Sequence, residues 1–489
     1  MQTGTKVREL MLIGGEWTEA VNQEFFPVEN PARRGSIIAE VPRATEADVN
    51  KAVEAAQAAF ESWRKIPSRE RGRLLLKIAD AVEAQAEDFA RLLSTETGNA
   101  LRTQARGEIK GACDIIRYFG GVAGELKGET MPVENNLFAY TQREPYGVIG
   151  GIIPWNAPLS LAALKIAPAI TTGNTIVLKA AEDAPLTVLK LAKVCSEFLP
   201  PGVVNIITGF GAECGAPLAN HPLVQKLTFT GSTATGKSIM RAAAERIIPV
   251  SLELGGKSPQ IVYPDADNEK VLDNVISAMR FARQGQSCSA GSRLYLHKSI
   301  FDSFLNRLVA KLQQLKVGDP LDEATDMGSI INAKQFNKVV NYIREGIQHE
   351  DAELIVGGLP PAEGPLAEGY YVEPTIFVSK DDCWRLAQEE IFGPVMIVIP
   401  WEDEEEVIQM ANRSNYGLAA FIWTNDVNKA ISTANRLEAG WVQINRGGGM
   451  MTGHAYGGYK QSGIGREYSL ESMLNSFTQT KSIIIDYNN

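Results

Sequence analysis

The sequence predicts an α/β protein with parallel β-sheet, and three features of its 489 residues support this fold class. Apolar residues make up 44% of the chain, which is enough to fill packed globular cores. From about residue 145, short apolar segments alternate with helical patterns, as consecutive βαβ units do. At about 150 residues per domain, the length is consistent with roughly three domains.

The first third of the chain has mainly helical patterns. Residues 45–63 open with a Thr followed by acidic residues and then repeat Ala and Val at helical spacing. Residues 74–97 continue in the same style and end before Gly98. We therefore expect one helix in each of these two segments.

The alternating pattern that follows predicts the parallel sheet. The expected strands lie in VIGGIIPW, TIVLKA, VVNIITG, KLTFTGS and VSLELGG. The expected helices between them cover residues 159–170, 186–198 and 237–247. A second α/β block follows Pro259, with helices expected at 268–283 and 299–315.

Three further segments have other patterns. The Gly- and Pro-rich stretches at 357–369 and 447–458 are expected to be surface or site-lining loops. The tail at 480–487, TKSIIIDY, has the pattern of a strand with no partner nearby in the sequence. A terminal strand of this kind often joins another sheet, including one in a second subunit.

Charge and cysteine usage disfavour several classes of function. The net charge of −10 makes nucleic acid an unexpected partner, because duplex binding depends on clustered Lys and Arg. No window approaches the roughly 20 apolar residues of a membrane helix, and no cleavable signal is evident. The five cysteines are widely spaced without a CxxC, and the four histidines form no HxxxH or HExxH. We expect no metal site, no disulfide framework and a cytoplasmic location.

One segment matches a nucleotide-binding motif. Residues 231–238, GSTATGKS, fit GxxxxGK[ST] between an expected strand and helix, and Asp265 after the apolar IVYP could imitate a Walker B residue. These features allow a P-loop NTPase. The same residues also allow a strand–Gly–helix turn that offers a helix N-terminus and Ser232 to any pyrophosphate. The chain has no GxGxxG, so the motif by itself leaves both interpretations open.

Four short segments are unusually rich in chemically useful residues. Cys288 lies in a small, polar, Gly-bounded turn, QGQSCSAGSR, where a thiol can be exposed and ionised. Asn156 stands between two prolines directly after a strand and could donate to an oxyanion. Glu253 is in an apolar strand, where burial would raise its pKa toward that of a general base. The fourth segment, EEIFGP, places Glu390 and Phe392 beside a tight turn.

These segments resemble a known family when they are taken in order. PWNAPL, LKAAE, FTGS, LELGGKSP, GQSCSAGSR, EEIFGPV and GGYKQSGIGRE occur as in the NAD(P)-dependent aldehyde dehydrogenase superfamily, and the likeness extends from LIGGEW to the C-terminal strand. The resemblance favours the cofactor turn over a P-loop, which would leave Cys288, Asn156 and Glu253 unexplained. That intact set also argues against a catalytically silent crystallin or scaffold.

The resemblance implies a domain organisation. A Rossmann-like cofactor domain would comprise residues 1–122 and 144–255, and an α/β catalytic domain residues 256–455. A small β-strand oligomerisation arm would comprise residues 123–143 and 456–489. The assembly implied by the family is a homodimer or a homotetramer.

The resemblance also implies a reaction and the residues that perform it. Cys288 would attack an aldehyde to form a thiohemiacetal, with the Asn156 side chain and the Cys288 backbone N–H stabilising the oxyanion. After hydride transfer to NAD leaves a thioester, Glu253 would activate the water that hydrolyses it. Because acyl-CoA-forming members typically lack this glutamate, its presence favours release of the free carboxylic acid.

Cofactor contacts are implied in the same way. Lys179 and Glu182 would hold the adenosine ribose, and a carboxylate there repels a 2′-phosphate, which favours NAD over NADP. Ala180 replaces a proline common in the family. The remaining implied cofactor contacts are Trp155, Gly231, Ser232, Glu390 and Phe392.

Substrate contacts are implied more weakly. The positions that resemble the family's tunnel are Gly107, Gly111, Ala157, Ser160, Leu161, Leu164, Ala282, Ser287, Ser289, Met450 and Tyr456. Several are small, which favours a wide pocket for a bulky, aromatic or heterocyclic aldehyde over acetaldehyde. Basic residues near the mouth could pair with a substrate carboxylate, although a solvated surface role is favoured for each: Arg106, Lys110, Arg283, Arg446 and His454.

Overall fold

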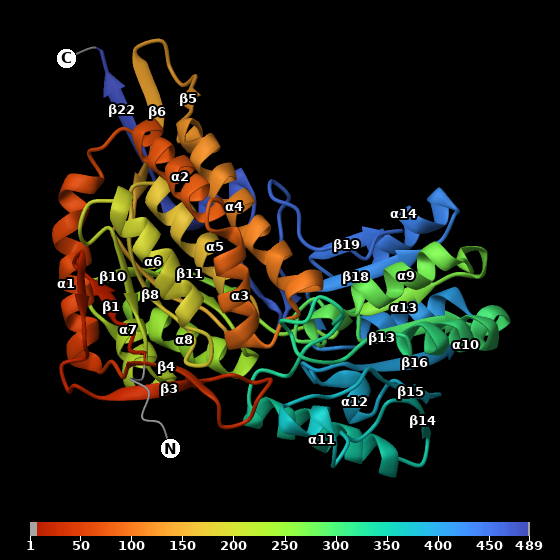
Figure 1. The fold of residues 1–489 in the computed structure, drawn as a ribbon. Helices are drawn as coiled ribbons and strands as arrows, with labels where there is room; N and C mark the ends of the chain where they lie inside the picture. Colours follow the sequence, from red (N-terminus) through yellow and green to blue (C-terminus); the bar gives the residue numbers. More distant parts are fainter. Residues whose placement is uncertain (1–6, 488–489) are drawn as a thin grey trace, which may run out of the picture.

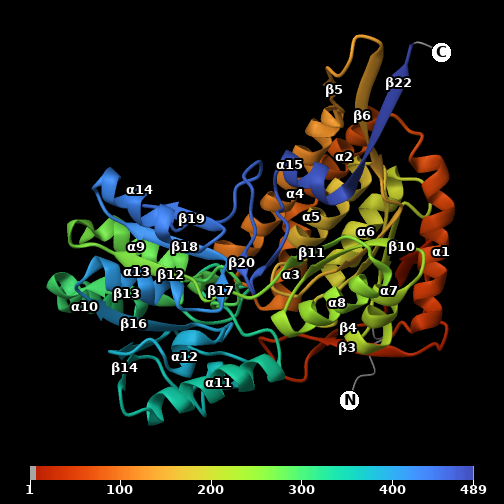
Figure 2. The same cartoon turned by 180° about the vertical axis from the view of Figure 1, so that it is seen from behind.

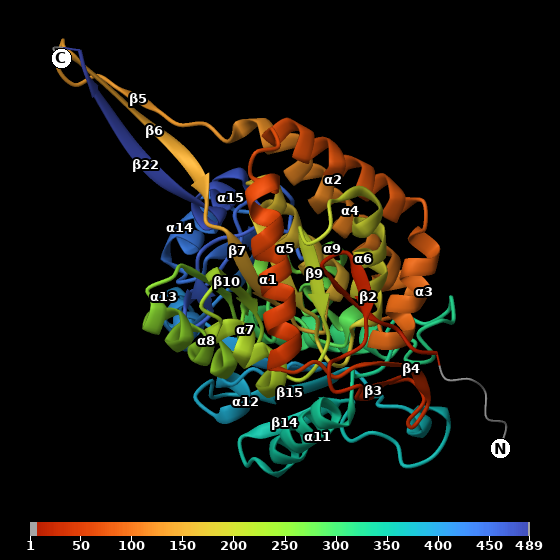
Figure 3. The ribbon, with the colours of Figure 1, turned by 90° about the vertical axis from the view of Figure 1, so that its left-hand side faces the viewer.

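The structure, a computed structural model, describes residues 7–487 and has two large sheets and a projecting arm (Figure 1). One sheet has eight strands and the other seven, and each is flanked by helices. The arm is a three-stranded sheet that stands away from the body and carries the C-terminus at its tip (Figure 3). The α/β fold class predicted from the sequence is therefore confirmed.

The eight-stranded sheet has a parallel centre. Its strands run in the order β2 (Glu16–Thr18), β1 (Met11–Ile13), β9 (Val204–Ile207), β8 (Thr175–Lys179), β7 (Val148–Ile152), β10 (Val224–Thr230), β11 (Val250–Glu253) and β21 (Gly463–Ile464). Strands β7 to β11 are parallel, whereas β1, β2 and β21 join by antiparallel pairing. Every residue of β8 and β9 is buried because helices cover both faces.

Eight helices surround this sheet among the described residues. They are α1 (Glu46–Trp63), α2 (Ser68–Glu83), α3 (Ala86–Thr97), α4 (Arg106–Gly121), α5 (Pro158–Thr171), α6 (Leu186–Phe198), α7 (Ala216–Asn220) and α8 (Thr233–Arg246). Helices α1, α7 and α8 contact one another and one face of the sheet, and α5 and α6 pack on the other face. Helices α2 to α4 form an outer layer on α5 and α6.

The seven-stranded sheet is parallel except at one edge. Its order is β14 (Ala352–Val356), β15 (Thr375–Ser379), β16 (Val395–Trp401), β13 (Arg293–His297), β12 (Pro259–Val262), β18 (Ala419–Trp423) and β19 (Trp441–Ile444), with only β14 antiparallel. Its helices are α9 (Glu269–Ala278), α10 (Phe301–Leu312), α11 (Ala333–Gln348), α12 (Arg385–Gln388), α13 (Glu404–Asn412) and α14 (Val427–Arg436). Because side chains alternate along a strand, Leu294 and Leu296 face one core and Tyr295 the other.

Short elements connect the two sheets. Strands β17 (Tyr416–Gly417) and β20 (Tyr459–Lys460) pair with each other, and the chain then returns to the first sheet as β21 and α15 (Leu470–Phe477) (Figure 2). A separate hairpin, β3 (Phe25–Glu29) and β4 (Ile37–Pro42), lies near the N-terminal end. Among residues 7–487, no helix is both long and apolar enough to cross a bilayer.

The arm pairs two distant segments of the chain. Strand β22 (Thr478–Asp486) lies antiparallel to β6 (Leu137–Pro145), from Thr478 opposite Pro145 onward. Strand β5 (Thr130–Met131) adds to the other side of β6. The C-terminal strand therefore finds its partner within its own chain.

Some helix boundaries are determined by local sequence signals, and others are not. A capping box at Thr45 starts α1, and Gly98 ends α3 in the left-handed region with φ 75°. The helix expected at 74–97 is wrong as a single element, because the chain turns at Gln85 and divides it into α2 and α3. The helix expected at 268–283 ends as α9 because Arg280 adopts a left-handed φ of 61°.

The fold places several of the predicted site residues at one edge of the first sheet. Parallel strands place their carboxyl ends together, so the residues after β7, β8, β10 and β11 are neighbours. The chain order reverses between β7 and β10, which is the position where open α/β sheets bind ligands.

Candidate active site

Cys288 lies in an irregular turn between α9 and β13. The turn is reached through two left-handed residues, Arg280 and Gln284, with φ values of 61° and 53°. Gly285 has φ 65°, and a Cβ there would stand 2.1 Å from the carbonyl oxygen of Gly393. The turn can therefore press against the 393–394 segment only because residue 285 has no side chain.

The Cys288 thiol is half-buried and surrounded by charge. The pKa of the thiol is raised to about 11, mainly by burial and also by the negative charges of Glu390 and Glu253. A hydrogen bond from Tyr456 and the positive charge of Arg283 lower it. The Cys288 Sγ and Tyr456 hydroxyl oxygen are 3.6 Å apart.

Asn156 is held close to the cysteine turn. It follows β7, is 8% exposed, and donates from Nδ2 to the carbonyl oxygen of Gln286 at 3.0 Å. Helix α5 begins directly afterwards, and its N-terminus is held by Glu108, whose carboxylate accepts from the Leu159 backbone N–H at 3.2 Å. Within residues 7–487, the backbone N–H of Cys288 makes no hydrogen bond.

Glu253 is the last residue of β11 and is 4% exposed. Neither of its carboxylate oxygens has a hydrogen-bond partner among the described residues. Burial raises its pKa well above the usual range, and the nearby negative charge of Glu467 adds to the effect. Lys165, which donates to Glu467 in a fully buried ion pair, acts in the opposite direction.

The first group of predicted cofactor residues lies on the same sheet edge. Lys179 ends β8, and its Nζ is 2.8 Å from the Glu182 carboxylate, which is 40% exposed. Gly231 and Ser232 form the turn between β10 and α8, and Ser232 caps α8 by accepting from the Thr235 backbone N–H at 3.2 Å. One buried hydroxyl beside this turn, Thr230 Oγ1, has no hydrogen-bond partner within the described chain.

The second group of predicted cofactor residues comprises Glu390, Phe392 and Trp155. Glu390 accepts from the Gly256 backbone N–H at 2.9 Å, and its approach requires glycine at residue 255, where a Cβ would stand 2.7 Å from Glu390 Oε2. Phe392 has φ 59° and packs edge-on against Trp155 with ring centroids 5.3 Å apart. A small hollow lies here, lined by Ser287, Glu390 and Phe392 among others.

The predicted tunnel residues fall into two groups. Gly111 and Ser160 face each other across the packed helices α4 and α5, while Ser287 Oγ and Ser289 Oγ are 3.3 Å apart in the cysteine turn. Ala157 and Leu161 are buried at the start of α5, and Met450 is partly buried against the same core. Leu164 instead lines a separate hollow next to Glu467, Tyr468 and Arg466.

Three of the five basic residues predicted near the tunnel mouth form ion pairs with carboxylates. Arg106 forms ion pairs with Glu87 and Glu323, and Lys110 forms one with Asp114. The Arg283 guanidinium is 3.7 Å from the buried Glu108 carboxylate. Neither Arg446 nor His454 forms an ion pair within residues 7–487.

The P-loop interpretation fails on geometry. Only Gly231 and Ser232 separate β10 from α8, so Lys237 and Ser238 lie on an exposed helical face instead of a phosphate-wrapping loop. Asp265 belongs to the other sheet's side of the molecule, where its carboxylate accepts from Thr424 Oγ1 at 2.9 Å and from the Asn425 backbone at 2.7 Å.

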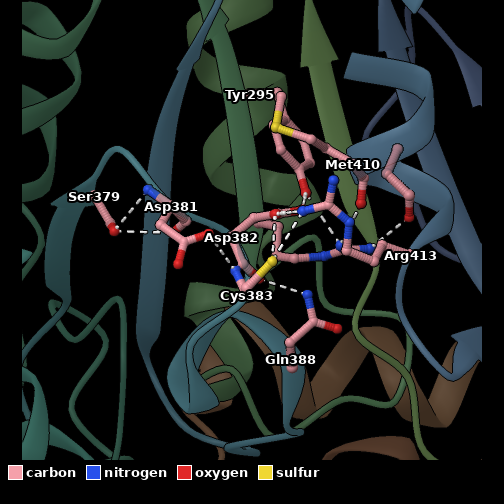
Figure 4. A network of polar contacts seen from close by, with 10 residues as sticks. Tyr295, Ser379, Asp381, Asp382, Cys383, Gln388, Met410 and Arg413 are labelled. Atoms are coloured by element: carbon pink, nitrogen blue, oxygen red, sulfur yellow. Dashed lines mark hydrogen bonds and ion pairs between the residues drawn. The ribbon is translucent and has the colours of Figure 1, made fainter. Parts of the chain in front are cut away.

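One acidic cluster has ligand types suited to a metal ion. Among residues 7–487, Asp381, Asp382 and Cys383 are the one group of this kind whose ligand atoms lie within 4.8 Å of one another. The Asp382 carboxylate already accepts from the Arg413 guanidinium and from the Tyr295 hydroxyl (Figure 4). A guanidinium therefore occupies the place a cation would take.

Comparison with known proteins identifies the family. The model described as "Aldehyde dehydrogenase family" matches residues 17–483, nearly the whole chain. The chain belongs to the aldehyde dehydrogenase family. This family oxidises aldehydes to carboxylic acids with NAD(P) through a thioester on a cysteine, and the chain is an NAD-dependent oxidoreductase of this type.

Several aldehyde dehydrogenases resemble the chain along its full length. Phenylacetaldehyde dehydrogenase of Pseudomonas fluorescens is 41% identical, covering 99% of this chain and 97% of that protein. Hydroxyisobutyraldehyde dehydrogenase of Mycolicibacterium austroafricanum is 42% identical, covering 99% and 95%. The NAD⁺ complex of the Bacillus cereus aldehyde dehydrogenase is 40% identical, covers 98% of this chain and 96% of its own, and has a TM-score of 0.95.

Sequence reasoning missed three features of the site. These features are the ion pair between Lys165 and Glu467, the hydrogen bond between Tyr456 and Cys288, and the buried Nζ of Lys257, which has no hydrogen-bond partner among residues 7–487; all three depend on packing. Lys165 does interrupt an otherwise apolar helix, and that interruption was the one local signal available.

Proposed function

We propose that this aldehyde dehydrogenase uses Cys288 as nucleophile, Asn156 and the Cys288 backbone N–H as oxyanion donors, and Glu253 as general base. The main support is that these groups lie together near the carboxyl edge of the first sheet, and that among residues 7–487 the Cys288 backbone N–H and the Glu253 carboxylate have no hydrogen-bond partner. A structural carboxylate with the burial of Glu253 would normally have hydrogen-bond partners.

The first step is attack of the Cys288 thiolate on the aldehyde carbon. The C–S bond forms while the carbonyl electron pair moves to oxygen, which becomes an oxyanion. One hydrogen of the Asn156 amide goes to Gln286, and the second remains for the oxyanion. The unused backbone N–H of Cys288 is the second donor, as in oxyanion holes generally.

The last step is hydrolysis of the thioester. Glu253 would remove a proton from water as the water attacks the acyl carbon, and the thiolate of Cys288 then leaves. Burial raises the pKa of Glu253, which makes its carboxylate a stronger base than an exposed one. The product is a free carboxylic acid.

The donor set fits NAD. The buried Thr230 hydroxyl, which has no hydrogen-bond partner among residues 7–487, precedes the turn at Gly231 and Ser232, where the N-terminus of α8 favours a pyrophosphate. When bound, NAD accepts the hydride that leaves the thiohemiacetal carbon. Glu182 favours NAD over NADP because its charge repels a 2′-phosphate.

Lys179 and Glu182 would hold the adenosine ribose, and Glu390 the nicotinamide ribose. Trp155 and Phe392 would pack beside the nicotinamide.

The substrate class we propose is a bulky or aromatic aldehyde. The tunnel positions on α4 and α5 include Gly111, Ala157 and Ser160, whose small side chains leave room for a wide group. The similarity to a phenylacetaldehyde dehydrogenase supports the same class. Steady-state NADH formation should give a higher kcat/KM for aromatic aldehydes than for acetaldehyde, and a clear preference for acetaldehyde would contradict the proposal.

The proposed nucleophile is tested by substitution. We expect Cys288→Ala to abolish NADH formation with every aldehyde while still binding NAD, measured by calorimetry. Cys383→Ala is the matched control, because that cysteine is exposed and lies between β15 and α12, elements of the second sheet and its helices. Full activity of Cys288→Ala would refute the mechanism.

We also propose a homodimer or homotetramer assembled through the arm, in the cytoplasm. Strand β22 presents Ile484 and Ile485, with side chains 66% and 43% exposed, on a sheet that projects from the body. All five cysteines are free, which suits a reducing compartment.

A further inference from the structure

Tyr456 has a hydroxyl beside the nucleophile. Its oxygen is 3.6 Å from Cys288 Sγ, which is within hydrogen-bond distance for sulfur. Within residues 7–487, this is the one hydrogen bond that the Tyr456 hydroxyl forms. The family resemblance implies that Tyr456 lines the substrate tunnel, and that role would need only the aromatic ring.

The Tyr456 ring is fixed in position. The side chain is 4% exposed and packs edge-on between Trp441 and Tyr468, with centroid distances of 5.3 and 5.8 Å. Its backbone is paired with Glu467 by two hydrogen bonds of 3.1 and 2.8 Å. The hydroxyl therefore cannot turn toward solvent without breaking these contacts.

The residue after Tyr456 lies against Glu253, the proposed general base. Gly457 has φ 158°, and a Cβ there would stand 2.8 Å from Glu253 Oε1. The same two-residue segment thus touches both Cys288 and Glu253.

The chemistry of the two groups gives the hydrogen bond a direction. Burial and the neighbouring Cys288 and Glu253 raise the pKa of Tyr456 well above its usual value, so the phenol keeps its proton. A thiolate can only accept a hydrogen bond. Whenever Cys288 is ionised, Tyr456 must therefore be the donor.

The charges around Cys288 explain why a donor matters there. The negative charges of Glu390 and Glu253 raise the pKa of the Cys288 thiol and oppose a second negative charge there. The cations that favour the thiolate are Arg280 and Arg283, of which Arg283 is shared with Glu108. A neutral donor stabilises the thiolate without adding a charge to the tunnel.

We propose that Tyr456 is a catalytic residue that donates a hydrogen bond to the Cys288 thiolate and orients it for attack on the aldehyde. This inference rests on the proposed role of Cys288. Phenylalanine at the same position would fill the same space without the donor.

The direct test is the pH dependence of Cys288 alkylation. Wild-type enzyme and Tyr456→Phe are treated with iodoacetamide over a range of pH, and the Cys288 peptide is quantified by mass spectrometry. We expect the midpoint for Tyr456→Phe to rise by about one to two pH units, because hydrogen bonds to charged groups are among the stronger ones. At a fixed pH below the midpoint, Cys288 of Tyr456→Phe should therefore be alkylated about ten- to hundredfold more slowly than Cys288 of the wild-type enzyme.

Two controls separate this effect from a general disturbance. The Cys383 peptide of the same samples should keep its profile, because that thiol is exposed and has Arg413 as its neighbour. Tyr468→Phe removes another buried hydroxyl from the same aromatic group and should leave the Cys288 profile unchanged. An unshifted or downward-shifted midpoint in Tyr456→Phe would overturn the proposal.

Transient kinetics provide the second readout. Tyr456→Phe should slow the NADH burst, which follows attack by Cys288, more than the later hydrolytic phase, in which attack by water precedes departure of the thiolate. Equal slowing of both phases would indicate a structural role and overturn the inference. Failure of the proposed function is distinguishable, because it would appear as full activity in Cys288→Ala.

Discussion

Substitution of Glu253 by Gln separates the two halves of the proposed reaction. The side chain is 4% exposed, both of its oxygens lack partners within the described chain, and Gln has nearly the same shape. General base catalysis contributes about 10²- to 10⁴-fold, so hydrolysis of the thioester should slow by that factor, or about 3 to 5 kcal/mol in barrier. Attack by Cys288 does not require Glu253 in this scheme.

Glu253→Gln should even favour thiolate formation. The Glu253 carboxylate raises the pKa of Cys288, so its neutralisation lowers that pKa and allows attack at lower pH. Stability should not fall. The folded pKa of Glu253 lies above its unfolded value, so the native carboxyl costs stability as pH rises past the unfolded pKa, and Gln removes that cost.

Stopped-flow measurement of NADH absorbance is the assay. We expect Glu253→Gln to give a burst approaching one NADH per active site, followed by slow turnover, and to accumulate acyl-enzyme visible by intact mass. The control is Glu402→Gln, whose side chain is 68% exposed and pairs with Lys298 at the surface. A variant with no burst would place Glu253 in the attack step, and wild-type turnover would remove it from the mechanism.

Three further predictions concern other parts of the molecule. Lys165→Met breaks the buried pair with Glu467 and should cost about 3 to 5 kcal/mol in unfolding free energy, seen as a lower urea midpoint; an unchanged midpoint would contradict the pairing. Glu182→Gln should raise the KM for NAD about tenfold and narrow its advantage over NADP, whereas an unaltered NAD-to-NADP ratio would exclude this role. Ile484→Asp should reduce the assembly mass in light scattering and Leu359→Asp, also exposed, should not; equal masses for all three proteins would argue against the arm.

The elements with local signals could be predicted from the sequence. The capping box at Thr45 and the left-handed Gly98 are encoded within a few residues of the helix ends they define. The break at Gln85 has neither Gly nor Pro beside it, so only packing of α2 and α3 against their neighbours reveals it. Arg280 likewise ends a helical pattern without a breaker, because its left-handed conformation is held by contacts from its guanidinium to Gly447 and Gly448.

The candidate active site could likewise be predicted only in part from the sequence. Cys288, Asn156 and Glu253 could be selected because each stands out in its own segment. Their environment could not be predicted, since the charge that acts on Glu253 comes from Glu467 and the donor to the thiol comes from Tyr456. Those contacts join segments that meet only after both sheets have formed.

The pairing of β22 with β6 has a consequence for biosynthesis. Strand β6 leaves the ribosome long before Thr478, which faces Pro145 in the folded arm. Until β22 has been made, β6 therefore has one open edge, of the kind that invites pairing with other nascent chains. A chain that stopped before β22 would contain every residue of the proposed chemistry and still expose this edge of β6. We expect such chains to aggregate, so that pairing with β22 protects the arm from association with other chains.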